Sequence, residues 1–226
     1  MPQRDAGRRE VKIGSPVMAR NDALAAENRS LFQRLHILAV NLISSPGSGK
    51  TTLLEALAGL LGDDLAVIEG DVQTRRDAER IAKKGCAVFQ IETGGACHLN
   101  AEAVGRALAA LNIEEKTPKI LVIENVGNLI CPAAFDLGEE MKAAILSVPE
   151  GDDKVLKYPA VFSRIAALLV NKIDLLPHLE FDPRRAVAEC RSLNAAVEAF
   201  YLSARTGEGV DRFCAYLLEK RSASLA

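Results

Sequence analysis

Residues 44–52 read Ser-Ser-Pro-Gly-Ser-Gly-Lys-Thr-Thr, the most informative segment of the chain. An apolar run precedes it at 37–43 and a helical pattern follows it at 53–61, so a glycine-rich turn joins a strand to a helix. This arrangement is that of a phosphate-binding P-loop. Glycines let backbone N–H groups curl around a phosphate, and the helix N-terminus favours an anion.

The residues of this turn have separable roles. Lys50 adds a point charge at the β- and γ-phosphates and is a catalytic candidate, and the Thr51 hydroxyl can coordinate Mg²⁺. The consensus has glycine where this chain has Ser44, so a turn that only begins a helix is the alternative interpretation. We assign nucleotide binding to Gly47, Ser48, Gly49, Lys50, Thr51 and Thr52.

A second motif, Asn171-Lys172-Ile173-Asp174, follows the apolar run 165–170 and indicates the base. Guanine presents two adjacent donors that the Asp174 carboxylate can accept, whereas adenine would leave a buried carboxylate without partners. Asn171 would tie this loop to the P-loop or to the base, and the Lys172 stem can cover the base. Alone, four polar residues after a strand could be an ordinary turn.

A third motif follows the apolar stretch 199–202 and completes the predicted guanine site. Loops of this kind contact the guanine oxygen through backbone N–H groups, so arginine in place of the common lysine changes little. An ordinary turn between a strand and a helix is the alternative. The residues of this motif are Ser203, Ala204 and Arg205.

Composition narrows the class of protein. The net charge of −2 gives no indication of nucleic-acid binding, and no apolar run is long enough to span a membrane. Residues 1–10 are polar and arginine-rich, which is not the pattern of a secretory leader. The five cysteines are therefore expected to be reduced, in a cytoplasmic protein.

Short apolar runs alternate with helical patterns along the chain. The strands are predicted near 37–44, 65–70, 87–92, 119–124, 143–148, 165–170 and 199–202, and the helices near 15–34, 52–61, 74–84, 101–111, 183–193 and 210–218. This order predicts an α/β P-loop NTPase fold with a mostly parallel central sheet and helices on both faces. We expect residues 1–36 to form a tail and lead-in helix, residues 37–226 to form the nucleotide-binding domain, and residues 151–158 to form a charged, mobile loop.

Carboxylates follow several of the predicted strands. Parallel strands deliver their C-terminal ends to one edge of the sheet, so these groups should gather around the phosphates. Glu124 and Asp71 are the preferred candidates for Mg²⁺ binding or for orienting water, and Asp77 is a weaker catalytic candidate that could simply cap a helix. Glu69 and Glu92 are further candidates.

Cys97 and His98 follow the strand end at Glu92, and Cys131 follows the strand end at Glu124. Two thiolates and an imidazole suit Zn²⁺, or Ni²⁺ where the geometry can flatten toward square-planar. Adjacent Cys-His is a poor local chelate, and three ligands leave a site incomplete, which a symmetric dimer could complete. A cysteine alone is more often a small buried hydrophobe, the role expected for Cys86, Cys190 and Cys214.

Together these motifs resemble the hydrogenase nickel-incorporation GTPases, the HypB family. The resemblance runs from about residue 11 to the C-terminus and rests on specific segments. They are 41–54 around the P-loop, Glu69-Gly70-Asp71, 92–99 ending in Ala-Cys-His-Leu, 124–132 beginning Glu-Asn-Val-Gly-Asn, and Lys157-Tyr158-Pro159. The serine at position 44 is part of the family pattern.

The resemblance implies slow GTP hydrolysis, with GTP or GDP, Mg²⁺ and Ni²⁺ or Zn²⁺ as ligands. It implies a homodimer in the GTP-bound state, with Cys97, His98 and Cys131 forming a metal site at its interface. The implied partners are a small nickel metallochaperone of the HypA type and the hydrogenase large-subunit precursor, and neither nucleic acid nor membrane is expected. Some members carry an N-terminal cysteine-rich or histidine-rich nickel segment, and the pattern here predicts no such storage site.

Three other functions compete with this interpretation. Nickel GTPases that serve urease are expected to carry Cys-Pro-His, which Cys97-His98 does not match. A small-molecule phosphotransferase would leave the motif at 171–174 unexplained. A metal carrier that uses GTP only as a structural ligand would show turnover insensitive to the Mg²⁺ carboxylates.

Overall fold

The computed structural model describes residues 15–70 and 75–225 and shows a seven-stranded sheet in which every pairing is parallel. The strand order is β3-β2-β4-β1-β5-β6-β7. The strands are β1 (Leu38–Ser44), β2 (Leu65–Glu69), β3 (Ala87–Gln90), β4 (Ile120–Glu124), β5 (Met141–Ser147), β6 (Ala167–Asn171) and β7 (Glu198–Leu202). All seven predicted strands are confirmed.

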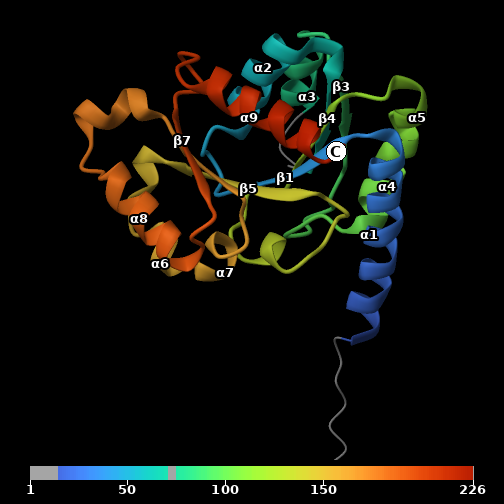
Figure 1. Cartoon of the computed structure of the whole chain (residues 1–226), viewed down its shortest axis with the longest axis horizontal. Helices are drawn as coiled ribbons and strands as arrows, with labels where there is room; N and C mark the ends of the chain where they lie inside the picture. Colours follow the sequence, from blue (N-terminus) through green and yellow to red (C-terminus); the bar gives the residue numbers. More distant parts are fainter. Residues whose placement is uncertain (1–14, 71–74, 226) are drawn as a thin grey trace, which may run out of the picture.

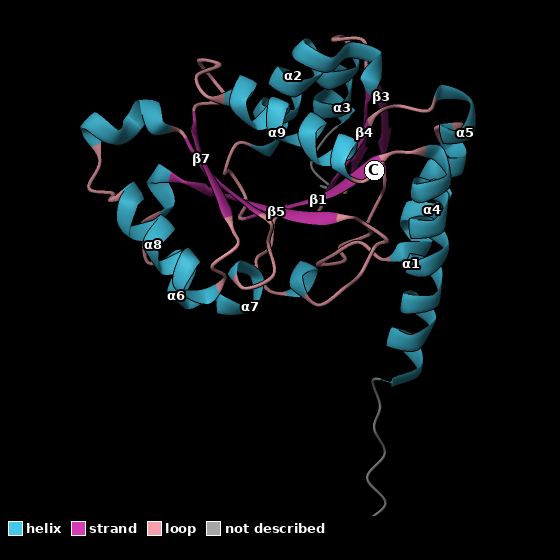
Figure 2. Cartoon of the chain, viewed as in Figure 1, coloured by secondary structure: helices cyan, strands magenta, loops and turns pink. Residues whose placement is uncertain are grey.

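Helices cover both faces of this sheet (Figures 1 and 2). The α-helices are α1 (Ser15–Leu35), α2 (Lys50–Leu61), α3 (Arg75–Ala82), α4 (Ala101–Ala110), α5 (Ile113–Lys116), α6 (Lys154–Lys157), α7 (Pro159–Phe162), α8 (Pro183–Leu193) and α9 (Val210–Ala223). Short 3-10 helices are η1 (Gly62–Asp64), η2 (Cys131–Ala133), η3 (Val148–Glu150) and η4 (Ile173–His178). The predicted α/β fold with a parallel sheet is confirmed.

Successive side chains of a strand point to opposite faces of the sheet, so the contacts of β1 show which helices cover each face. On β1, Leu38, Val40 and Leu42 face a cluster formed with α2, α3 and α9. The opposite face is divided in two: Ala39 packs with α1 and α4, and Ile43 packs with α6, α7 and α8. Strands buried on both faces explain the continuous apolar runs of the sequence.

The prediction of a mobile loop over 151–158 is wrong in part. Helix α6 lies within it, and Val155 is completely buried against α7 and α8. An ion pair between Lys157 and Asp153, one turn apart, and another between Arg185 and Asp152 accompany this packing. The charged composition of this segment gave no indication that Val155 would be buried and hold it in place.

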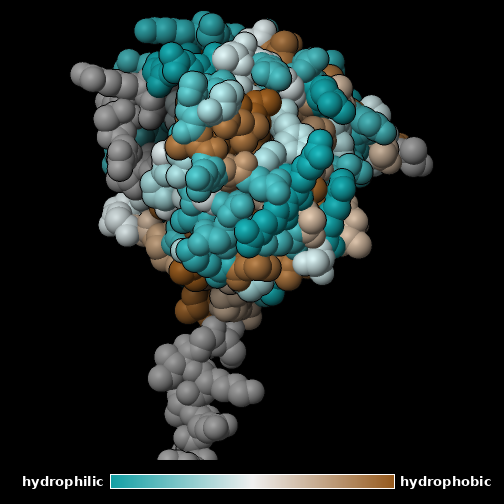
Figure 3. Space-filling view, turned by 90° about the vertical axis from the view of Figure 1, so that its left-hand side faces the viewer, coloured by the Kyte–Doolittle hydropathy of each residue, from teal (hydrophilic) through white to brown (hydrophobic). Residues whose placement is uncertain are grey.

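The surface on the side of α8 and β7 is mostly hydrophilic, with a compact gathering of hydrophobic side chains near its middle (Figure 3). None of the described helices is long and apolar enough to cross a membrane.

Candidate functional site

The P-loop lies between β1 and α2, and its glycines have the backbone conformations that the motif requires. Gly47 and Gly49 have φ values of 73° and 97°, in the left-handed region that favours glycine. Helix α2 begins at Lys50, whose side chain is only 4 % exposed. The turn therefore places a buried lysine at the N-terminus of a helix, where an anion is favoured.

Ser44 fits where the consensus has glycine because its backbone needs no left-handed conformation. It ends β1, is fully buried, and its φ is not positive. Its hydroxyl accepts a 2.7 Å hydrogen bond from Ser48 Oγ and donates one of 2.9 Å to the Ser45 carbonyl. The hydroxyl groups of Ser44 and Ser48 thus form their hydrogen bonds within the loop. Serine at position 44 is therefore compatible with a P-loop and gives no support to a turn that only begins a helix.

The Asn-Lys-x-Asp loop lies directly against the P-loop. Asn171 Nδ2 donates a hydrogen bond to the Ser48 carbonyl, and Lys172 Nζ donates one of 2.7 Å to the Gly47 carbonyl. Asn171 therefore ties this loop to the P-loop, one of the two roles expected for it. A Cβ at Gly49 would lie 2.5 Å from Asn171 Nδ2, so glycine is needed here for space as well as for conformation.

The third motif joins the same cluster. Ser203 Oγ donates a 2.7 Å hydrogen bond to Asp174 Oδ1, and the Ala204 N–H donates one of 3.0 Å to Asn171 Oδ1. Ser203 is fully buried, whereas Arg205 is exposed. The three motifs, far apart in sequence, are therefore in contact at the C-terminal ends of β1, β6 and β7.

Glu124 is the strand-end carboxylate that the structure places beside the P-loop. It ends β4 next to β1, is 2 % exposed, and its Oε1 lies 4.0 Å from Lys50 Nζ. The following loop also approaches closely, since a Cβ at Gly127 would lie 3.1 Å from Pro46. The half-buried Thr51 hydroxyl and the buried Glu124 carboxylate are oxygen donors of the kind that suits Mg²⁺, so this edge fits the expected ion.

The other acidic candidates divide into three cases. Glu69 ends β2 and is 3 % exposed, at the same edge of the sheet. Glu92 is exposed beyond the edge strand β3, which is separated from β1 by two strands. Asp71 lies outside the described residues, and so does the side chain of Asp77, whose backbone belongs to α3.

Cys97, His98 and Cys131 come together as predicted. Their ligand atoms all lie within 4.8 Å of one another, with 3.1 Å between the two sulfur atoms and 3.3 Å between Cys97 Sγ and His98 Nδ1. The adjacent Cys-His pair therefore converges, contrary to the expectation of a poor local chelate. The His98 ring stacks on Phe135 with 3.8 Å between ring centroids, which fixes its plane.

The environment adjusts the protonation of these groups. The hydrogen bond with Cys131, with lesser effects of desolvation and charge, raises the pKa of the exposed Cys97 thiol. Partial burial lowers the pKa of His98. A neutral imidazole is the form that binds a metal ion, and the shared proton of the thiol pair is the one that a metal would displace.

Several asparagines that the sequence reasoning missed hold this region together. Asn125, directly after Glu124, accepts a 3.1 Å hydrogen bond from the Leu99 N–H, and its amide donates to Asn41 on β1. Asn128 Nδ2 donates a 3.2 Å hydrogen bond to the Cys97 carbonyl. Both asparagines belong to the Glu-Asn-Val-Gly-Asn segment, and their presence there was the one sign of this role in the sequence. They link the loop of Cys97 and His98 to the edge of the sheet that carries the P-loop.

The remaining cysteines have the packing role expected of them. Cys86, Cys190 and Cys214 are buried and free of disulfides. Burial raises the pKa of Cys86 and of Cys190 to about 11, so neither thiol ionises readily.

These features define a P-loop nucleotide-binding protein with a Cys/His cluster, able to hold a metal ion, beside its phosphate edge. Residues 38–200 match the family model described as "CobW/HypB/UreG, nucleotide-binding domain". The chain is 50% identical over 219 residues to a hydrogenase maturation factor HypB of Azotobacter vinelandii, covering 96% of this chain and 72% of that protein. It is 46% identical to the HypB of Escherichia coli K12, covering 96% and 74%. The chain belongs to the HypB family of hydrogenase maturation factors.

A solved structure agrees with this assignment. HypB from Helicobacter pylori, crystallised in complex with nickel, matches with a TM-score of 0.85 at 41% identity, covering 90% of this chain and 96% of that chain. Both the fold and the family indicated by the sequence motifs are therefore confirmed.

Proposed function

We propose that this chain is a GTP-binding and GTP-hydrolysing metallochaperone that assists nickel insertion into [NiFe]-hydrogenase, with slow intrinsic turnover. One observation carries the proposal: the loop that bears Cys97 and His98 is hydrogen-bonded, through Leu99 and Asn125, to the strand end that carries Glu124. Metal ligands and phosphate-binding groups thus share one edge of the sheet. Hydrogenase maturation by HypB relatives and the nickel complex of the Helicobacter pylori protein support it.

Each nucleotide-binding group has a chemical task. Asp174 accepts from the guanine edge, and the P-loop N–H groups with Lys50 bind the phosphates. Thr51 and Glu124 would hold Mg²⁺, which supplies charge neutralisation at the phosphates when bound, and Asp71 is a further candidate ligand. The buried carboxylate of Glu124, near Lys50, is the group that we assign to orienting water.

Nickel is the cargo in this proposal. Two thiolates and one imidazole give three donors, and a second copy of the chain would complete the coordination at a dimer interface. The cluster suits this arrangement because Cys97 is exposed and the neighbouring Ile130 is 65 % exposed. Zn²⁺ would bind the same donors. A small metallochaperone would supply or receive the ion, and the hydrogenase precursor would accept it.

GTP would gate the metal site through the shared loops. Binding of the γ-phosphate would draw the loops after Glu124 and Glu92 inward, position Cys97, His98 and Cys131, and favour the dimer. Hydrolysis would relax these loops and weaken the site. This is an order–disorder switch of the kind that GTPases use.

The test is Ni²⁺ and Zn²⁺ binding by the apo, GDP-bound and GTP-analogue-bound protein, with mass measured by light scattering in each state. Nucleotide-dependent affinity and dimerisation that are lost in Cys97→Ala and Cys131→Ala are expected. Equal metal affinity in the GDP and GTP-analogue states would refute the gate. Cys190→Ala, at a buried thiol outside the cluster, is the matched control.

Hydrolysis needs its own test. Lys50→Ala and Glu124→Gln are each expected to slow single-turnover GTP hydrolysis by roughly a hundredfold or more, because each removes charge beside the phosphates. Lys84→Ala, at an exposed lysine beyond α3, is the control and should hydrolyse normally. Turnover unaffected by Glu124→Gln would favour the carrier that uses GTP only as a structural ligand.

A further inference from the structure

Helix α1 bridges the two loops that carry the metal ligands. Asn21 accepts a 3.0 Å hydrogen bond at Oδ1 from the Ala101 N–H and donates one of 2.8 Å from Nδ2 to the Asp136 carbonyl. Ala101 follows His98 by three residues, and Asp136 follows Cys131 by five. A single buried amide therefore connects the chain just after one set of ligands to the chain just after the other.

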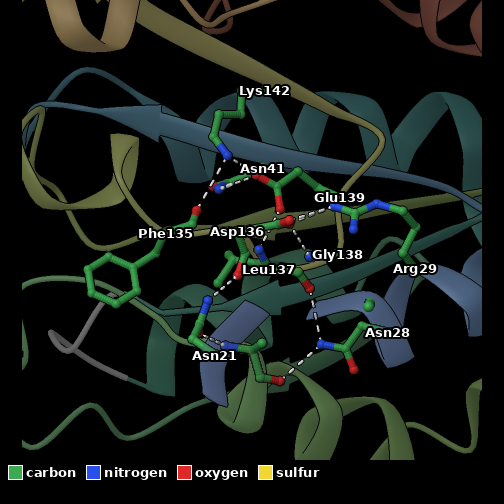
Figure 4. Close-up of polar contacts among 12 residues, drawn as sticks. Asn21, Asn28, Arg29, Asn41, Phe135, Asp136, Leu137, Gly138, Glu139 and Lys142 are labelled. Atoms are coloured by element: carbon green, nitrogen blue, oxygen red, sulfur yellow. Dashed lines mark hydrogen bonds and ion pairs between the residues drawn. The ribbon is translucent and has the colours of Figure 1, made fainter. Parts of the chain in front are cut away.

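Asn28 repeats this bridge two helical turns further along the same face of α1. Its Nδ2 donates to the Ala101 carbonyl at 2.9 Å and to the Leu137 carbonyl at 3.0 Å. Asn21 and Asn28 are 6 % and 7 % exposed, so solvent does not replace these bonds easily. Figure 4 shows both side chains reaching from the helix to the segment 135–138.

The segment after Cys131 is also held from its other side. Glu139 accepts from the Leu137 N–H at 2.7 Å and from Asn41 on β1, and it forms an ion pair with Lys142 on β5. Arg29 of α1 pairs with Asp136 at 2.7 Å. The sheet thus fixes this segment (Figure 4), and α1 fixes Ala101, the first residue of α4, against it.

We propose that α1 sets the distance between the two halves of the metal site, with Asn21 and Asn28 as its positioning residues. Cys97 and His98 lie outside the helices and strands, and Cys131 begins the short helix η2, so the placement of the ligands depends on such contacts. A metal ion tolerates errors of only about 0.2 Å in ligand distance, so loss of the bridges changes coordination before it changes the fold. The inference rests on the proposed metal site.

The variant Asn28→Asp tests this directly. Aspartate has the same shape but no N–H, so it places oxygen against two carbonyl oxygens. We expect Ni²⁺ affinity to fall at least tenfold and the thiolate-to-nickel charge-transfer absorption to shift, while GDP affinity stays within about twofold. Gln33→Glu makes the same chemical change at an exposed position of α1 and should alter neither the affinity nor the spectrum.

A second readout works without any metal. In the unsubstituted protein the sulfur atoms of Cys97 and Cys131 are 3.1 Å apart, so diamide should oxidise the two thiols to a disulfide quickly, being reduced itself to the hydrazine. We expect this rate to fall severalfold in Asn28→Asp. Asn21→Ala removes one bridge and keeps the other, so it should show a smaller decrease in the rate. It also keeps the inference testable if Asn28→Asp fails to fold.

The outcomes separate the inference from the proposed function. Unchanged nickel spectrum and unchanged disulfide rate in both variants would overturn the role of α1. Equal losses of nickel and GDP affinity would also overturn it, because they would indicate general destabilisation. If the unsubstituted protein bound no nickel, the proposed function would fail, and the disulfide rate would still decide the role of α1.

Discussion

Asn171 Nδ2 donates a 2.8 Å hydrogen bond to the carbonyl of Ser48, joining two loops that are 123 residues apart in sequence. The oxygen of the same side-chain amide, Asn171 Oδ1, accepts hydrogen bonds from the N–H groups of Lys172 and Ala204. One side chain therefore connects the phosphate loop to both loops of the proposed base site. The geometry of the base site depends on the P-loop backbone, which makes the residues around this contact sensitive to substitution.

Gly49→Ala should disrupt this contact. The new Cβ would lie 2.5 Å from Asn171 Nδ2, and the φ of 97° is strained for alanine. We expect nucleotide affinity to fall by tenfold or more and the free energy of unfolding to fall by about 1–2 kcal/mol. Isothermal titration with GDP and urea denaturation would measure both.

Gly59→Ala is the matched control for this substitution. Gly59 lies in α2, and a Cβ there would meet nothing within 4 Å. Alanine should stabilise the helix by about 0.5–1 kcal/mol and leave GDP affinity unchanged. Equal behaviour of the two variants would contradict the contact between Gly49 and Asn171.

Asp174→Asn should change the preferred base. In the proposed site the carboxylate would accept two hydrogen bonds from guanine, whereas an amide offers one acceptor and one donor, the pattern that complements xanthine. We expect GTP affinity to fall roughly a hundredfold and XTP to become the better ligand, since bonds to charged groups contribute about 1.5–3 kcal/mol each. Competition binding against a labelled nucleotide would show this. Asp211→Asn, on α9, should retain the preference for GTP, and a retained preference in Asp174→Asn would refute the assignment.

The five cysteines should divide into two classes of reactivity. Cys97 is exposed and Cys131 half-buried, whereas Cys86, Cys190 and Cys214 are buried. Iodoacetamide at about pH 8 should alkylate the first pair at least tenfold faster, because the reagent can reach these sulfur atoms, whereas burial shields the other three and suppresses their thiolates. Peptide mass spectrometry of the native protein would read this out. Rapid alkylation of Cys190, whose pKa burial raises to about 11, would contradict the packing described for α8.

The pair of Arg29 and Asp136 should contribute a pH-dependent part of the stability. Burial of Asp136 acts to raise its pKa, but the hydrogen bonds from Arg29 and the Gly138 N–H, with the charges of Arg29 and Lys142, lower it overall. A carboxyl whose pKa is lower in the folded state stabilises fully above its unfolded pKa of about 3.9, and loses that contribution as pH falls through the folded value.

Asp136→Asn should therefore lower the free energy of unfolding at pH 7 by up to about 1 kcal/mol, a modest value because the pair is partly exposed. The variant should also lose less stability than the parent when the pH falls from about 4 to 2. Urea denaturation across this range would measure the difference. Asp22→Asn, at an exposed position of α1, is the control, and a parallel pH profile for Asp136→Asn would argue against the pairing.

Much of the site was predictable because its groups belong to continuous motifs at strand ends. The contact of Ser203 with Asp174 and the convergence of Cys97 with Cys131 follow from parallel strands that end at one edge. The functions of Asn21 and Asn28 were not predictable. Asparagines on a helix carry no local signal of a partner, and Ala101 lies 80 and 73 residues away from them.

The amino-acid sequence alone was enough to predict the parallel α/β fold, the phosphate loop, the proposed guanine motif and the three residues of the proposed metal site. Each of these features depends on residue types that lie close together in sequence. Such residues form the same local hydrogen bonds and turns in any chain that passes from a strand through a turn into a helix. The tertiary structure was needed to show how the two ligand loops are placed and that α1 bridges the segments that follow them. It also decided that Val155 anchors a charged segment. These features depend on hydrogen bonds and packing between segments that only the complete fold brings together.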